Sequence, residues 1–192
     1  SDPVYQSKKI AKHKELAIEL YKKGFAYACD CSEETLTKMR EEQIVKKQKP
    51  KYNGLNRNKN IKFAQGMVLR FKFPLEGKSK FKDLILGDIE IDNKEFDDFI
   101  ILRSDGSPTY NFSAAIDDMY MKITTVIRGD DHITNTLKQI NVLDALGATI
   151  PSYAHLPMVL AESGKRLSKR DGAEDILDYK KKGYLNDALI NY

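Results

Sequence analysis

The chain has 192 residues, which suits one large domain or two small ones, and 41% of them are hydrophobic, enough for an ordinary core. Its 32 basic and 28 acidic side chains leave a net charge of +4, which excludes a strongly polycationic chain, although clustered lysines can still form a basic surface. No apolar run approaches the roughly 20 residues that span a bilayer, and the first residues carry no signal-peptide pattern, so we expect no membrane partner.

The first elements in chain order are a helix, a strand and a second helix. An apolar stripe predicts a helix over 7–23, which Gly24 ends, and a short strand follows at 25–31. Ser32 is a suitable N-cap for the second helix, whose pattern fades before Pro50.

The next stretch predicts a loop followed by short strands. Residues 51–65 are polar and rich in Asn, Lys and Gly, so we expect a loop there. Alternating apolar residues over 67–73 predict a half-buried strand that places Arg70 on its polar face. Three more strands are expected, at 81–86, 89–91 and 99–102, with turns at Gly87-Asp88 and Asp92-Asn93.

From Ser104 onwards, strands and helices alternate. This pattern is typical of a parallel α/β sheet. The expected elements are a turn at 104–108, helices at 110–121, 134–146, 173–182 and from 185 onwards, and buried strands at 123–127 and 155–160.

A basic loop follows the last predicted strand and reads Arg166-Leu167-Ser168-Lys169-Arg170. It is suited to gripping a triphosphate, because nucleotidyl transfer depends on positive charge placed where negative charge develops. Lysine supplies a mobile point charge for this purpose. Taken alone, however, a basic pentapeptide is more often an ordinary surface loop.

A second polar segment places Arg128 between a predicted strand and a predicted helix. This is the carboxyl end of a parallel strand, where open α/β sheets bind ligands. A guanidinium there can hold a substrate carboxylate through two hydrogen bonds. The alternative is a structural ion pair from Arg128 to Asp118 or Asp131.

Together these segments resemble the bacterial-type glutamyl-tRNA synthetases, which are class I enzymes, and the resemblance covers essentially the whole chain. The loop 166–170 resembles their second signature, usually written KMSKS, with Arg166 in place of its first lysine. The segments 105–112, 126–132 and 155–160 match the family's middle region in order and spacing. Glu41-Glu42-Gln43 and Lys49-Pro50-Lys51-Tyr52 resemble its acceptor-end-binding domain.

The resemblance implies an α/β fold, the second half of a Rossmann-like nucleotide-binding fold with an inserted α+β domain. The implied divisions are 1–27 (end of the first half), 28–103 (insert that binds the tRNA acceptor end), 104–178 (second half) and 179–192 (start of a helical stem-contact region). None of the histidines, His13, His132 and His155, forms the His-x-Gly-His motif of the family's first half. We therefore expect an internal fragment, inactive alone, with the first half before Ser1 and the anticodon-binding region after Tyr192.

The activity implied is the activation of glutamate by ATP, with Mg²⁺, followed by transfer to the 3′ end of tRNA(Glu). The resemblance assigns catalysis to Lys169, Arg166 and Ser168, and glutamate binding to Tyr110 and Arg128. It assigns ATP binding to Lys169, Asp131, His132, Met158 and Val159, and contacts with tRNA to Lys46, Lys47, Lys49 and Lys51. We expect a cytoplasmic monomer.

Some relatives bind zinc through a Cys-x-Cys pair, which Cys29 and Cys31 resemble. Tyr52 is present as well, but Asn56 and Asn58 stand where further ligands would be, and asparagine is a poor zinc ligand. We therefore expect ordinary cysteines and no zinc. We also expect the two thiols to point to opposite faces of the strand, which would prevent a disulfide.

Four other functions stay open. One is a glutamyl-Q tRNA(Asp) synthetase-like paralogue, which glutamylates a modified base in tRNA. Another is a non-catalytic tRNA-binding module. A glutaminyl enzyme fits less well, and a chain that charges both types of tRNA remains an alternative.

Overall fold

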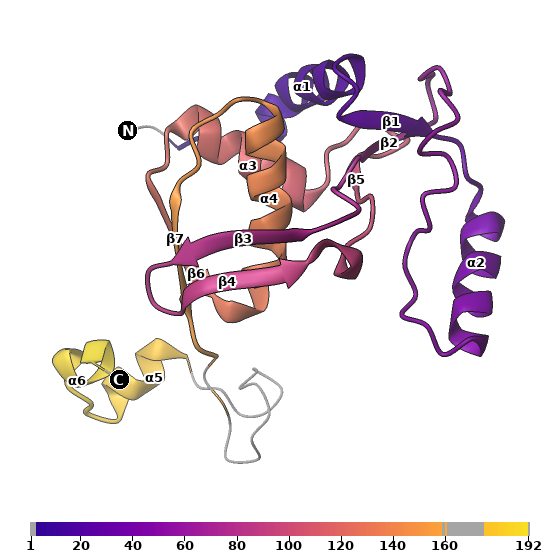
Figure 1. Cartoon of the computed structure of the whole chain (residues 1–192). Helices are drawn as coiled ribbons and strands as arrows, with labels where there is room; N and C mark the ends of the chain where they lie inside the picture. Colours follow the sequence, from indigo (N-terminus) through magenta and orange to yellow (C-terminus); the bar gives the residue numbers. More distant parts are fainter. Residues whose placement is uncertain (1–2, 159, 161–174, 192) are drawn as a thin grey trace.

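The computed structural model describes residues 3–158, 160 and 175–191, which form two sheets with some helices packed on them and others standing apart (Figure 1). The helices are α1 (Ile10–Lys22), α2 (Glu33–Val45), α3 (Tyr110–Met121), α4 (Ile133–Ala145), α5 (Ile176–Lys181) and α6 (Asn186–Asn191). The strands are β1 (Ala26–Cys29), β2 (Val68–Phe71), β3 (Lys78–Asp83), β4 (Gly87–Asp92), β5 (Ile100–Leu102), β6 (Thr125–Gly129) and β7 (Ser152–Leu156).

The larger sheet, in the order β4-β3-β7-β6, contains the predicted parallel pairing. β6 and β7 run parallel over five residue pairs, and β3 joins the other edge of β7 in parallel at Asp83 and Tyr153. β4 then returns antiparallel to β3 as a hairpin. This sheet combines strands from both sides of residue 104, and the division into an insert over 28–103 and a catalytic half over 104–178 stays a prediction.

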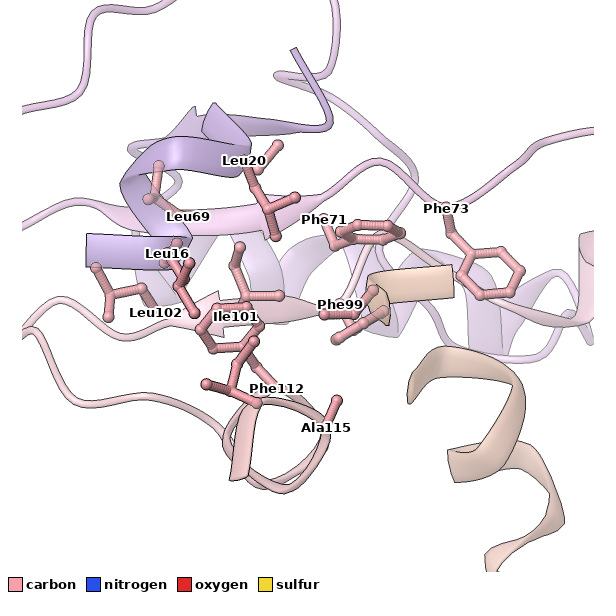
Figure 2. Packing of buried hydrophobic residues seen from close by; sticks show 14 of the residues in the cluster. Leu16, Leu20, Leu69, Phe71, Phe73, Phe99, Ile101, Leu102, Phe112 and Ala115 are labelled. Atoms are coloured by element: carbon pink, nitrogen blue, oxygen red, sulfur yellow. The ribbon is translucent and has the colours of Figure 1, made fainter. Parts of the chain in front are cut away.

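One hydrophobic core joins α1, the antiparallel sheet β1-β2-β5, and the helices α3 and α4. Leu20, Leu69, Ile101 and Phe112 are fully buried in it, and Figure 2 shows their side chains gathered between the strands and the helices. Burying one such side chain stabilises the fold by about 1.5–3 kcal/mol. The core therefore fixes α3, whose first residue, Tyr110, belongs to the predicted site.

The predicted helices are confirmed where the structure describes them, although residues 173–174 of the helix predicted at 173–182 lie outside the described residues and α5 covers Ile176–Lys181. α3 has the predicted bounds, and α1 and α4 lie within about three residues of theirs. The Ser32 hydroxyl accepts a hydrogen bond from the backbone N–H of Thr35 at 3.2 Å, as expected for an N-cap of α2. Gly24 adopts a φ of +83°, the left-handed conformation that commonly ends a helix.

The predicted position of β3 is wrong by three residues. The strand covers Lys78–Asp83 instead of 81–86, and the apolar residues 84–86 form the turn into β4. The cause is the Asp83 carboxylate, which accepts hydrogen bonds from the backbone N–H groups of Ile85 and Leu86 at 2.9 and 3.0 Å. An aspartate that binds the backbone two residues on ends an extended segment.

The two parallel strands β6 and β7 are also displaced from their predicted positions, and β6 is not the buried strand that we expected. It lies at an edge of the described sheet, and Arg128 points towards α4. Ile127 points to the opposite face and is 65% exposed. A parallel strand is buried only where both faces of its sheet are covered, and in this structure one face of β6 is open.

β2 departs from the expectation in the other direction, because its polar face is buried as well. Arg70 is only 5% exposed. Its guanidinium lies 3.7 Å from the centre of the Tyr52 ring, and its Nη1 donates to the backbone carbonyl of Asp98 at 2.8 Å. The loop that carries Tyr52 therefore covers the face of β2 that we expected to be open.

Candidate functional site

The candidate site lies where β6 and β7 end and α4 begins. Arg128 is the penultimate residue of β6, and a short 3-10 turn, Asp130–His132, connects β6 to α4. The rings of Tyr110 and His132 are 6.1 Å apart between centroids. The Met158 sulfur lies 3.7 Å from the position that a Cβ atom would occupy on Gly129. The chain thus brings together the described members of the predicted ATP and glutamate sets.

The remaining predicted residues of this set lie outside the described residues. They are Val159 and the loop Arg166, Leu167, Ser168, Lys169 and Arg170. Their assignment to ATP and to catalysis stays a prediction.

The guanidinium of Arg128 is anchored along one edge. Its Nη2 donates to the Thr136 hydroxyl at 2.6 Å and to the Gln139 side-chain oxygen at 2.9 Å, and its Nε lies 3.5 Å from Nε2 of His155. In the part of the chain that the structure describes, Nη1 has no hydrogen-bond partner and Arg128 forms no ion pair with Asp118, on which it acts only through its charge. The two Nη1 donors are therefore available to a ligand.

The charge of Arg128 also acts on the half-buried Asp118 and on the buried Tyr153. Burial raises the pKa of Asp118, the neighbouring Asp117 raises it further, and Arg128 opposes both effects. Burial likewise raises the pKa of Tyr153 to about 12, again against the influence of Arg128. The Tyr153 hydroxyl is buried and has no partner among the described residues. Arg128 is thus the positive centre of a largely buried polar cluster.

Asp83 and His155 form a buried pair behind Arg128. Asp83 is 2% exposed and His155 is fully buried, and Oδ2 of Asp83 lies 2.7 Å from Nδ1 of His155. Burial alone would raise the pKa of Asp83, but hydrogen bonds from Leu86, His155 and Ile85 outweigh it and lower the pKa to about 2. The carboxylate is therefore ionised at neutral pH.

Sequence reasoning missed the roles of Asp83, Thr136 and Gln139. One signal was available, because His155 stands in an otherwise apolar strand and a buried histidine needs polar partners. Its partners could not be identified, since Asp83 is separated from it by 72 residues.

The four lysines predicted to contact tRNA lie together at the end of α2 and just beyond it, and α2 stands apart from the α3–α4 pair (Figure 1). Lys46 and Lys47 are exposed. Lys49 pairs with Glu95 at 3.0 Å, and Lys51 donates to the backbone carbonyl of Lys94. Two of the four lysines therefore attach the end of α2 to the segment after β4.

The two cysteines point to the same side, so the prediction of opposite faces is wrong. Cys29 and Cys31 lie 3.5 and 3.8 Å from the Tyr52 hydroxyl. Residues two apart in an extended segment share a face, and the prediction ignored this spacing. The Tyr52 hydroxyl also accepts a hydrogen bond from the backbone N–H of Asn56, whose side-chain amide donates to Asp30.

These contacts do not fit a zinc site. A structural zinc ion needs four good ligands, and the Asn56 side chain presents a donor, engaged with Asp30, where a ligand would be required. Within the described ranges, no three His, Cys, Asp or Glu side chains are grouped so that they could hold a metal ion.

None of the helices in the described ranges is both long enough and apolar enough to cross a bilayer.

Comparison with known proteins identifies the family. The family model described as tRNA synthetases class I (E and Q), catalytic domain, matches residues 1–192. Glutamate–tRNA ligase 1 of Coxiella burnetii (strain RSA 331 / Henzerling II) is 53% identical over 191 residues, which are 99% of this chain and 41% of that protein. The glutamate–tRNA ligase of Nitrosospira multiformis is 50% identical over 192 residues, with the same coverage.

A solved structure agrees with these relatives. The crystal structure of a glutamate tRNA ligase from Elizabethkingia meningosepticum, in complex with its amino acid, has a TM-score of 0.82 and 30% identity, and the match covers 100% of this chain and 44% of that one. The chain therefore spans less than half the length of the relatives it matches. By the match along its whole length, the chain belongs to the class I tRNA synthetases of the E and Q group, in their catalytic domain.

Proposed function

We propose that the full-length protein is a glutamate–tRNA ligase and that this chain supplies the second half of its catalytic fold. The observation that carries the proposal is the state of Arg128, whose Nη2 is anchored to Thr136 and Gln139 while Nη1 has no hydrogen-bond partner among the described residues. The names of the relatives, all matched over 99% or more of this chain, support the same activity.

Arg128 binds a carboxylate of glutamate through Nη1 in this proposal. A guanidinium keeps its charge at any physiological pH and forms strong charge-assisted hydrogen bonds with carboxylates. Tyr110 is 53% exposed at the first turn of α3 and faces His132 across the site, so it contacts the same substrate.

ATP binds on the other side, against Met158 and Val159 for the adenine and near Asp131 and His132. The glutamate α-carboxylate attacks the α-phosphate, the bond to the β-phosphate breaks, and pyrophosphate leaves. Lys169, with Arg166 and Ser168, neutralises the charge that builds up on the phosphates. Mg²⁺ shares this charge when it is bound with ATP.

The acceptor end of tRNA(Glu) reaches the adenylate over the region 28–103, which we propose as the acceptor-binding insert. Lys46 and Lys47 carry the phosphate contacts, because Lys49 and Lys51 already have protein partners. The open edge of β6, together with the open face from which Ile127 projects with 65% exposure, is the place where the first half of the nucleotide-binding fold docks. The protein acts as a monomer in the cytoplasm.

The test is glutamate-dependent ATP–pyrophosphate exchange by the full-length protein, measured with tRNA(Glu) present. The wild type should catalyse the exchange, and Lys169→Ala should do so at a rate at least about 100-fold lower. The control Lys180→Ala, at an exposed position, should have the wild-type rate. A wild type without glutamate-dependent exchange overturns the function and favours a non-catalytic module. Exchange followed by transfer to tRNA(Asp) and not to tRNA(Glu) identifies the modified-base paralogue, and normal exchange by Lys169→Ala removes the role of Lys169.

A further inference from the structure

We propose that a buried hydrogen-bond chain from Asp83 through His155 and Thr136 positions the guanidinium of Arg128 for its substrate carboxylate. The three residues lie on β3, β7 and α4, and Arg128 lies on β6, so these hydrogen bonds connect three strands and one helix. The inference rests on the proposed function in one respect, namely that Arg128 binds the glutamate carboxylate.

The hydrogen-bond chain begins at the Asp83 carboxylate, both of whose oxygens have hydrogen-bond donors. Oδ1 of Asp83 accepts from the backbone N–H groups of Ile85, Leu86 and His155, at 2.9, 3.0 and 3.2 Å. Oδ2 faces Nδ1 of His155 at 2.7 Å. An ionised carboxylate can only accept hydrogen bonds, so the proton between Asp83 and His155 is on Nδ1 of the imidazole. Asp83 thereby fixes the tautomer of His155.

His155 then presents the lone pair of Nε2 towards Arg128. Nε2 lies 2.9 Å from the Thr136 hydroxyl and 3.5 Å from Nε of Arg128, and because the guanidinium N–H can only donate, Nε2 faces it as an acceptor. The ring is fully buried and is packed against Phe81 and Tyr153, with centroid distances of 5.8 and 6.3 Å. These rings hold the imidazole in a single orientation.

The Thr136 hydroxyl connects His155 to the guanidinium of Arg128. Its hydroxyl has one proton, for which His155 Nε2 at 2.9 Å and the backbone carbonyl of His132 at 3.2 Å compete, and its oxygen accepts from Nη2 of Arg128 at 2.6 Å. Gln139 takes the second Nη2 donor at 2.9 Å. With Nη2 held at two points, the plane of the guanidinium is fixed, and Nη1, which has no hydrogen-bond partner among the described residues, is left for the substrate carboxylate.

A purely structural role for the same contacts makes a different prediction. Loss of a structural contact would lower the stability of the fold, or change the KM values for glutamate and for ATP to the same extent. Loss of a positioning contact weakens glutamate binding and leaves ATP binding unchanged, because the chain ends at the residue that holds the carboxylate. The KM values for the two substrates therefore separate the two roles.

The experiment uses the full-length protein and three variants, Thr136→Val, Thr136→Ser and the control Thr134→Val. Valine has the shape of threonine without its hydroxyl, serine restores the hydroxyl, and Thr134 is exposed on the same helix. In pyrophosphate exchange with tRNA(Glu) present, Thr136→Val should raise the glutamate KM about 10-fold and change the ATP KM less than about twofold. Thr136→Ser should have a glutamate KM close to that of the wild type, and Thr134→Val should match the wild type in both KM values.

An unchanged glutamate KM in Thr136→Val, with normal exchange by the wild type, overturns the inference and leaves the proposed function standing. An equal rise in the KM for glutamate and for ATP overturns it as well, and so does a glutamate KM in Thr136→Ser that is as high as in Thr136→Val. Absence of glutamate-dependent exchange in the wild type overturns the proposed function and this inference together. If Thr136→Val is poorly folded, the same two KM values are measured for His155→Gln. This variant must then raise the glutamate KM and leave the ATP KM unchanged.

Discussion

Replacing Arg128 by lysine should weaken glutamate binding, although the positive charge is kept. In the proposed function the guanidinium does two things at once, because Nη2 holds Thr136 and Gln139 while Nη1 binds the substrate carboxylate. A lysine has a single ammonium group and cannot both satisfy these buried acceptors and reach a carboxylate with the same geometry. A hydrogen bond to a charged group contributes about 1.5–3 kcal/mol, so its loss corresponds to a rise in the glutamate KM of about 10- to 150-fold.

The assay is pyrophosphate exchange by the full-length protein with glutamate varied at saturating ATP, and then with ATP varied at saturating glutamate. The glutamate KM of Arg128→Lys should rise as stated and that of Arg128→Ala should rise at least as far, while the ATP KM stays within about twofold of the wild type. Arg40→Lys, an exposed position on α2, is the matched control and should leave both values unchanged. A wild-type glutamate KM in Arg128→Lys and Arg128→Ala would refute the reasoning.

Three further predictions concern other parts of the fold. The pKa of Asp83 is about 2 in the folded protein against an ordinary 3.8, so its stabilising effect of about 2 kcal/mol is present above about pH 4 and is lost as the pH falls towards 2. Asp83→Asn should therefore lower the free energy of unfolding in urea at pH 7 by about that amount and by clearly less at pH 3, and a difference that does not change with pH would contradict this account. Leu137→Ala, at a fully buried position of α4, should lower the free energy of unfolding in urea by about 3 kcal/mol. Leu177→Ala, at a position of α5 that is 60% exposed, should lower it by less than about 0.5 kcal/mol, and an equal decrease for both variants would argue against the described core. Combined replacement of Lys46 and Lys47 by alanine should reduce the slope of log Kd for tRNA against log salt by about 1.4, and an unchanged slope would remove these lysines from the interface.

Local sequence patterns were sufficient for the helices and for the position of Arg128. The spacing of apolar residues over 110–121 reflects a single face of α3, and the residues that produce it are neighbours in the chain. Arg128 was predicted as a site residue because it follows a predicted strand and precedes a predicted helix, and the structure places it as the penultimate residue of β6, just before the turn into α4. Both features can be recognised from a short window of sequence.

Features that depend on distant partners were not predictable. The apolar run 84–86 has the composition of a strand, but the Asp83 carboxylate captures the two N–H groups that would extend β3. Arg70 has the position of a surface residue until the Tyr52 ring covers it. The chain from Asp83 to Arg128 assembles residues from three strands and a helix, and no local pattern records which of them meet.

The most direct test of the account is a crystal structure of the full-length protein with glutamate bound. The account predicts a carboxylate oxygen of glutamate about 3 Å from Nη1 of Arg128, with Nη2 still bound to Thr136 and Gln139. A glutamate held by other residues, with Nη1 of Arg128 facing away from it, would contradict the central claim.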